Sequence, residues 1–235
     1  MLGCGGDKNA KDKAASAADT TDAAAITPDT YTTFTDTRDG KVYKIVKIGS
    51  QTWFAENLNY AAKGSKCYGE GDTVVLEEGL YSTPKKTLSP DEVQTNCAKY
   101  GRLYTWETAL TACPAGTHLP FDEEWATLVD YAGGDSTAGK KLKSSTGWER
   151  YKKYTGTDEY GFSAFPGGIH SSAGYFWYAG YTSDWWSATE KGTIYGGAWS
   201  WYIRHHNDKV YRNEVYKIVL ISVRCVLDDE KESQK

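Results

Sequence analysis

The feature that most constrains this fold is the segment from residue 160 to residue 190, in which aromatic side chains are interleaved with glycines. Glycine lets the backbone turn tightly between bulky rings, and each buried ring removes a large apolar surface from water. We therefore expect rings, rather than long helices, to fill the core of a loop-rich domain. Within this segment Trp185 and Trp186 are predicted to be core residues.

Length and charge narrow the class of protein. The 235 residues are enough for one domain of about 200 residues and a tail. A net charge of -4 without a basic stripe argues against a nucleic-acid partner. No run approaches the roughly 18 apolar residues that are needed to cross a membrane.

Four of the five cysteines lie inside the expected domain, and none of them forms the CxxC pair of a zinc site. They are typical of two disulfides formed in an oxidising compartment, with free buried thiols as the alternative. Of the three possible connectivities, we favour one that pairs Cys67 with Cys97 and Cys113 with Cys225.

The beginning of the chain resembles the end of a bacterial lipoprotein signal, so Cys4 is predicted to be lipidated. Residues 7–30 have almost no large apolar side chains and are predicted to be a disordered tether. The expected organisation is a lipobox-like N-terminus with its tether over 1–30, a single domain over 31–228 and a polar tail over 229–235. It is typical of an exported protein, held by a lipid anchor in the cell envelope at the outer membrane or the cell surface.

Local patterns predict several elements. Gly49-Ser50 separates two β-branched or aromatic runs and predicts a hairpin over 41–54. Ser89 begins a capping box for a helix that should end at Gly101. Further elements are expected as a short helix over 106–112, an amphipathic helix from about 122 to 132, short strands after 148 and a last strand over 217–226; residues 67–87 are expected to form a loop.

Several short motifs follow one another in a fixed order: Gln51-Thr52-Trp53, Glu56-Asn57-Leu58, Gly101-Arg102-Leu103-Tyr104, His118-Leu119-Pro120, Gly161-Phe162-Ser163-Ala164, Pro166-Gly167-Gly168, Trp185-Trp186-Ser187 and Arg224-Cys225-Val226. Together they resemble the Fibrobacter succinogenes major paralogous domain, a family of secreted or lipid-anchored bacterial proteins, over about residues 36–226. The motifs depart from the family at Phe121, where a small capping residue is usual, so the helix cap is expected to shift to Asp122.

This family is in turn similar to the formylglycine-generating enzyme and to C-type-lectin-like folds. The resemblance implies an α+β domain of the C-type-lectin-like class, with small twisted antiparallel sheets, two to three helices and long loops rich in glycine and aromatic residues. It also implies that a bridge between Cys113 and Cys225 would join the helical part to the last strand.

No convincing catalytic or metal site is found in the sequence. Formylglycine-generating enzymes use reactive cysteines, whereas all four domain cysteines are assigned here to bridges, so we expect no enzyme, no cofactor and no metal. An oxidase of that type is the less favoured alternative. His205 and His206 would point to opposite faces of a strand and are expected in a solvated turn, while His118 is expected to be structural.

A binding surface is the favoured function. Exposed aromatic rings stack on the apolar faces of sugars, which makes plant polysaccharide or another glycan the expected partner. The candidate ligand-binding residues are Tyr175, Trp177, Tyr178, Tyr181, Trp199 and Trp201, with Phe176 and Tyr202 as neighbouring rings of the same segments. Two alternatives remain open: some of these rings belong to the core, or the same face binds other proteins of the cell envelope.

Overall fold

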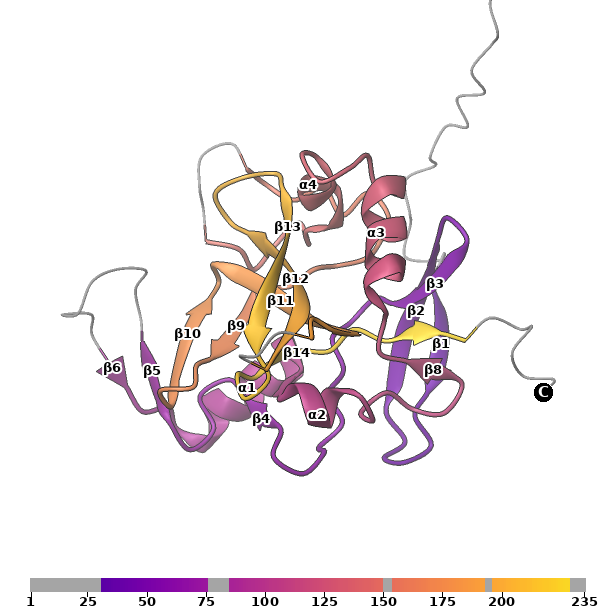
Figure 1. Cartoon of the computed structure of the whole chain (residues 1–235). Helices are drawn as coiled ribbons and strands as arrows, with labels where there is room; N and C mark the ends of the chain where they lie inside the picture. Colours follow the sequence, from indigo (N-terminus) through magenta and orange to yellow (C-terminus); the bar gives the residue numbers. More distant parts are fainter. Residues whose placement is uncertain (1–30, 76–84, 150–153, 193–195, 229–235) are drawn as a thin grey trace, which may run out of the picture.

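The computed structural model describes residues 31–75, 85–149, 154–192 and 196–228, which form three β-sheets and four α-helices (Figure 1). The helices are α1 (Pro90–Tyr100), α2 (Trp106–Ala109), α3 (Asp122–Tyr131) and α4 (Ala138–Leu142). The predicted lipidation site Cys4, the tether over 1–30 and the tail over 229–235 lie outside the described residues. The small α+β class predicted from the sequence is confirmed.

The predicted hairpin over 41–54 is confirmed. Strands β2 (Val42–Ile48) and β3 (Gln51–Phe54) pair antiparallel around Gly49, whose φ of 61° suits a tight turn. They belong to a five-stranded sheet in the order β1-β2-β3-β15-β8, with β1 (Thr32–Thr35), β8 (Thr117–His118) and β15 (Val226–Leu227). The two ends of the domain therefore meet in one sheet.

A six-stranded sheet contains the longest strands of the domain, in the order β13-β12-β11-β14-β7-β4. Three consecutive strands form an antiparallel meander: β11 (Thr182–Glu190), β12 (Gly197–Arg204) and β13 (Val210–Tyr216). The prediction of only short strands after residue 148 is therefore wrong. Cross-strand pairing extends these strands through segments whose local pattern looked irregular.

A four-stranded sheet lies beside the meander, in the order β6-β5-β10-β9 (Figure 1). Its strands are β5 (Thr73–Val75), β6 (Lys85–Lys86), β9 (Gly167–His170) and β10 (Tyr175–Ala179). The expected loop over 67–87 is wrong at β5, β6 and the end of β4 (Lys66–Cys67), while residues 76–84 lie outside the described residues. Strand β7 (Arg102–Tyr104) joins β4 to the larger sheet.

The boundaries of α1 follow the sequence signals. The Ser89 hydroxyl accepts a hydrogen bond from the Glu92 N–H, and the Glu92 carboxylate accepts one from the Ser89 N–H, which completes the capping box. The helix ends at Gly101, whose φ is 75°. A Cβ there would lie 2.7 Å from the carbonyl oxygen of Leu58, so the close approach of the next segment requires glycine.

The predicted cap of α3 is wrong. The N-cap position is Phe121 rather than Asp122, and the Glu124 carboxylate accepts the Phe121 N–H at 2.8 Å. The Asp122 N–H is bound by the Thr189 hydroxyl at 3.0 Å. A distant strand thus replaces the missing local cap, which leaves the Asp122 carboxylate free to bind other groups.

The predicted last strand over 217–226 is divided into two. Strand β14 (Ile221–Ser222) pairs with β7 and β11 in the six-stranded sheet, whereas β15 pairs with β3 and β8 in the five-stranded sheet. The residues between them pass through the core, where the side chains of Val223 and Arg224 are completely buried. Between the two strands the backbone binds the segment at and after β3: the Val223 carbonyl accepts a hydrogen bond from the Leu58 N–H and the Cys225 carbonyl accepts one from the Phe54 N–H, both at 2.9 Å.

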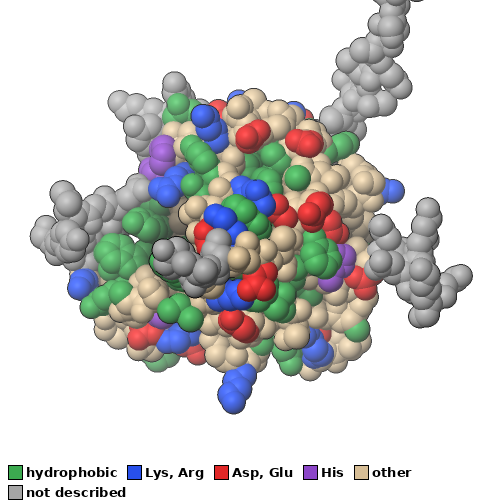
Figure 2. All heavy atoms as spheres, in the orientation of Figure 1, with side chains coloured by type: hydrophobic (Ala, Val, Ile, Leu, Met, Phe, Trp, Pro, Cys, Tyr) green, Lys and Arg blue, Asp and Glu red, His purple; other side chains and the backbone are tan. Residues whose placement is uncertain are grey.

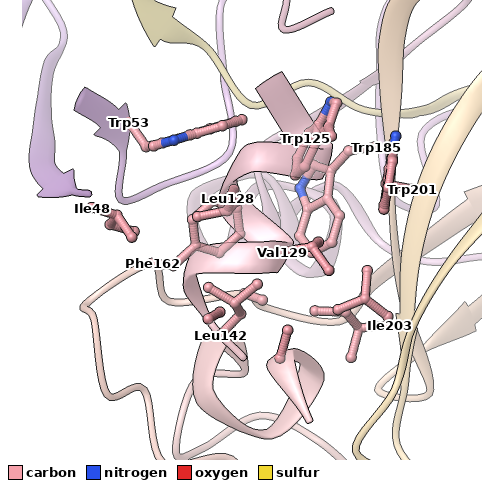
Figure 3. Close-up of a cluster of buried hydrophobic side chains, with 14 of the residues drawn as sticks. Ile48, Trp53, Trp125, Leu128, Val129, Leu142, Phe162, Trp185, Trp201 and Ile203 are labelled. Atoms are coloured by element: carbon pink, nitrogen blue, oxygen red, sulfur yellow. The ribbon is translucent and has the colours of Figure 1, made fainter. Parts of the chain in front are cut away.

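Tryptophan rings fill the largest core cluster, as expected (Figure 3). Trp185 lies 5.6 Å from Trp125 between ring centroids, and Trp125 lies 4.9 Å from Trp53. Trp186 belongs to a second buried cluster. The predicted core positions of Trp185 and Trp186, which are 1% and 0% exposed, are confirmed.

Both favoured disulfides are present. Cys67 is bonded to Cys97, and Cys113 is bonded to Cys225 with a Cα–Cα distance of 5.8 Å. The second bridge joins the segment after α2 to the residue that precedes β15. It therefore links the helical part to the end of the chain.

Candidate ligand-binding surface

Three rings from the predicted site gather on β10. Residues on a strand alternate between its two faces, so the buried Phe176 points into the core while Tyr175 and Trp177 are partly exposed on the other face. The centroids of the Tyr175 and Trp177 rings lie 6.5 Å apart in an edge-to-face arrangement. The Lys85 ammonium lies 4.4 Å from the Tyr175 ring.

Tyr178 departs from this alternation. Its φ of 67° is in the left-handed region, which a non-glycine residue adopts only at a cost of about 1–3 kcal/mol. The Tyr178 ring thereby lies beside the Trp177 ring, with 5.8 Å between centroids, although the two residues are neighbours in sequence. Three adjacent, partly exposed rings are the result.

A second group of rings lies on the meander. Tyr202 on β12 and Tyr211 on β13 are opposite each other, and their rings are stacked at 5.0 Å with an interplanar angle of 11°. On the side of β12 away from β13, Asp184 on β11 pairs with Tyr202. The Asp184 carboxylate accepts a hydrogen bond from the Thr182 hydroxyl at 2.7 Å. Burial raises the pKa of Asp184 to about 6. The row thus combines two flat rings with a carboxylate.

The two groups come from neighbouring sheets that pack on one core cluster. Ile169 on β9 stands opposite Trp177 and packs against the second core cluster, which contains Trp186. Trp186 shares its face of β11 with Asp184, and Asp184 stands opposite Tyr202. We call Tyr175, Trp177, Tyr178, Asp184, Tyr202 and Tyr211 the aromatic surface. In Figure 2 hydrophobic side chains gather in the region of β5 and β10.

The other predicted site residues lie elsewhere. Trp201 is 8% exposed in the main core cluster, and its indole N–H donates to the Asp122 carboxylate at 2.8 Å, so its place in an exposed surface is corrected. Trp199 is partly exposed, but the Arg212 guanidinium lies 3.4 Å from its ring centroid and the Lys191 ammonium 4.6 Å. The guanidinium, in direct contact with the ring, covers one face of Trp199.

Tyr181 lies in the turn after β10 and packs edge-on against His205, with 5.0 Å between ring centroids. His205 and His206 are in the turn between β12 and β13, as predicted, but His205 is 8% exposed, so the expectation of full solvation is wrong for that residue. The structural role expected for His118 is confirmed: its ring nitrogens bind Asp228 at 2.6 Å and Glu124 at 3.0 Å.

Sequence reasoning missed Tyr211 and Asp184 as members of the aromatic surface. In the sequence these two residues are marked only by the spacing of polar and aromatic residues along neighbouring strands. The register between the strands is needed to bring Asp184 and Tyr211 together. Within the described ranges, no group of three or more His, Cys, Asp or Glu side chains could hold a metal ion. In the same ranges no helix has the length and apolar character that crossing a membrane requires.

Chemically, this surface offers flat ring faces and one carboxylate acceptor. Ring faces attract polarised C–H groups, and a carboxylate accepts hydrogen bonds from hydroxyl groups.

The family model described as the Fibrobacter succinogenes major domain matches residues 46–227, a range that includes this surface. Comparisons with curated proteins and with solved structures found no match.

Proposed function

The chain belongs to the Fibrobacter succinogenes major domain family, and on that basis we propose that it is a surface-type binding module that recognises glycan chains through the aromatic surface. Family membership supports a secreted, surface-type protein. The ring faces of Trp177 and Tyr178 are the proposed platform for sugar rings. Asp184 is the proposed acceptor for sugar hydroxyl groups.

The observation that carries this proposal is the backbone of Tyr178. A left-handed tyrosine is costly, and strained residues of this kind persist only where the surrounding structure holds them, which is frequent at functional sites. Here the strain places two neighbouring rings on one side of a strand. A core residue would not need this arrangement, because alternation along β10 already buries Phe176.

Three further points belong to the same proposal. A C-type-lectin-like architecture would explain why the two ends of the domain share one sheet. Export is supported by the two disulfides, because such bridges persist in oxidising compartments. Lipidation of Cys4 would anchor the module to the envelope, and binding rather than catalysis would be its activity.

Pull-down on insoluble cellulose tests the proposed function. We expect the full chain to bind, and we expect Trp177→Ala/Tyr178→Ala to bind at least tenfold more weakly, which corresponds to about 1.4 kcal/mol. Tyr216→Ala is the matched control: Tyr216 is 59% exposed on β13 but alternates to the face opposite Tyr211. Equal binding by the double variant and the control would remove the proposed platform.

A further inference from the structure

A cavity of about 310 Å³ lies between β2, the segment after β3 and the end of α1, and none of the residues of the aromatic surface lines it. Its floor contains the buried residues Asn57, Gly101 and Arg224. Its rim contains Lys41, Lys44 and Lys99, together with one carboxylate, that of Glu56. Four cationic side chains against one carboxylate make the lining positive.

The charge of Arg224 at the floor is balanced by neutral oxygen atoms. Its Nε and Nη2 donate to the Asn57 side-chain oxygen at 3.1 and 2.8 Å, and its Nη1 donates to the carbonyls of Phe54 and Phe162 at 3.0 and 2.5 Å. Burial lowers the pKa of Arg224 to about 9, so the guanidinium still carries its charge at neutral pH. The guanidinium is bonded directly to neutral oxygen atoms, with the carboxylates of Glu56 and Asp158 acting on it at longer range, so the adjoining cavity keeps a positive potential.

The rim lysines add to this potential. In the described part of the chain their ammonium groups lie near rings rather than in ion pairs: Lys41 is 5.0 Å from the Tyr43 ring, Lys44 is 5.5 Å from the Tyr31 ring and Lys99 is 4.6 Å from the Tyr100 ring. Burial also lowers the pKa of Lys41. The Lys99 ammonium also donates to the Tyr100 hydroxyl at 2.8 Å, and Asp39 and Glu56 attract Lys41, so a bound anion would neutralise the positive charge that remains.

Two nearby carboxylates would repel a bound anion, but their negative charge does not outweigh the positive charge of the three rim lysines and Arg224. Glu56 accepts a hydrogen bond from the backbone N–H of Lys44 at 3.4 Å. Asp158 does not line the cavity; it is held by the backbone N–H and the hydroxyl of Ser163, at 2.7 and 2.5 Å. Burial raises the pKa of Asp158 from its ordinary value.

The walls provide ring faces. Tyr31 and Phe165 both line the cavity and are partly exposed. A flat, partly apolar molecule such as a sugar ring can lie against such faces while an acidic substituent points toward the cations. The combination therefore differs from a simple phosphate site, which needs donors but no ring contacts.

We infer that this cavity binds an acidic sugar, with its carboxylate toward Lys44, Lys99 and Arg224 and its ring against Tyr31 and Phe165. This site is independent of the aromatic surface. Binding is expected to weaken as salt is added, since exposed lysines contribute most of the attraction.

Titration of the isotope-labelled full chain by NMR tests the inference. Galacturonate is expected to shift the backbone amides of Asn57, Lys99 and Gly101 and to bind at least tenfold more tightly than galactose, which has the same ring without the carboxylate. Lys44→Ala/Lys99→Ala should weaken galacturonate binding at least fivefold. The control Lys63→Ala/Lys209→Ala removes the same charge from exposed positions outside the cavity and should leave the affinity unchanged.

Equal affinity for galacturonate and galactose would overturn the inference, and so would no binding of either. Inorganic phosphate that binds as tightly as galacturonate would also overturn it, because the ring contacts would then contribute nothing. Trp177→Ala/Tyr178→Ala should bind galacturonate with unchanged affinity. Failure of this site can therefore be distinguished from failure of the proposed cellulose-binding surface.

Discussion

Replacing Arg224 by lysine should cost about 3–5 kcal/mol of unfolding free energy. The guanidinium makes hydrogen bonds of 3.0 and 2.5 Å to the carbonyls of Phe54 and Phe162, and lysine cannot reproduce this planar fork. Each buried carbonyl that loses its donor costs about 1–3 kcal/mol. The guanidinium also lies 4.3 Å from the Phe162 ring, a contact worth up to about 2 kcal/mol when it is desolvated.

The loss would be large compared with the roughly 5–15 kcal/mol that stabilises an ordinary domain. Urea denaturation under oxidising conditions, followed by tryptophan fluorescence, measures it. Arg212→Lys is the matched control: Arg212 pairs with Asp122 at 2.6 Å but its side chain is 39% exposed, so about 1 kcal/mol or less is expected. A loss below about 1 kcal/mol for Arg224→Lys would refute the idea that this side chain joins the loops of the core.

Two other perturbations test the bridges and the His118 ion pairs. Removing the Cys113–Cys225 bridge by paired alanine substitution should destabilise more than removing Cys67–Cys97, because the sequence separations are 112 and 30 residues. The loop-entropy model gives about 4.8 against about 3.6 kcal/mol, and urea denaturation that shows the reverse order would contradict it. Glu124, and secondarily Asp228, raise the pKa of His118 to about 9, above its usual 6.5, so its stabilisation is complete below about pH 6.5 and is lost as the pH rises through 9. In thermal unfolding, the stability advantage of the wild type over His118→Gln should therefore be about 1 kcal/mol smaller at pH 10 than at pH 6.

Signals that act within a few residues were readable from the sequence. The capping box at Ser89, the glycine at 101 and the turn at Gly49 each place a local backbone conformation that the side chains themselves determine. The prediction that Trp185 and Trp186 are core residues followed from their size and from the segment around them, in which aromatic residues are interleaved with glycines. The two disulfide pairings were also anticipated.

Signals that depend on distant partners were misread. Phe121 can occupy an N-cap position only because Thr189 on another strand binds the Asp122 N–H. The apolar run over 217–226 looked like one strand, but its residues pair with two different sheets, and the backbone between them binds Phe54 and Leu58. Neither partner is visible within a local window.

The candidate site divides in the same way. Sequence alone predicted an aromatic core, two disulfide bonds and a β-hairpin near the beginning of the domain. Each of these predictions depends on residue type and on short spacings in the sequence. Only the tertiary structure decided which rings reach solvent. Trp199 and Trp201 lie on the same strand, yet one is partly exposed beside Arg212 and the other is bound to Asp122 in the core. Exposure depends on what the other strands and helices place against each ring, and that is set by register and packing across the whole chain.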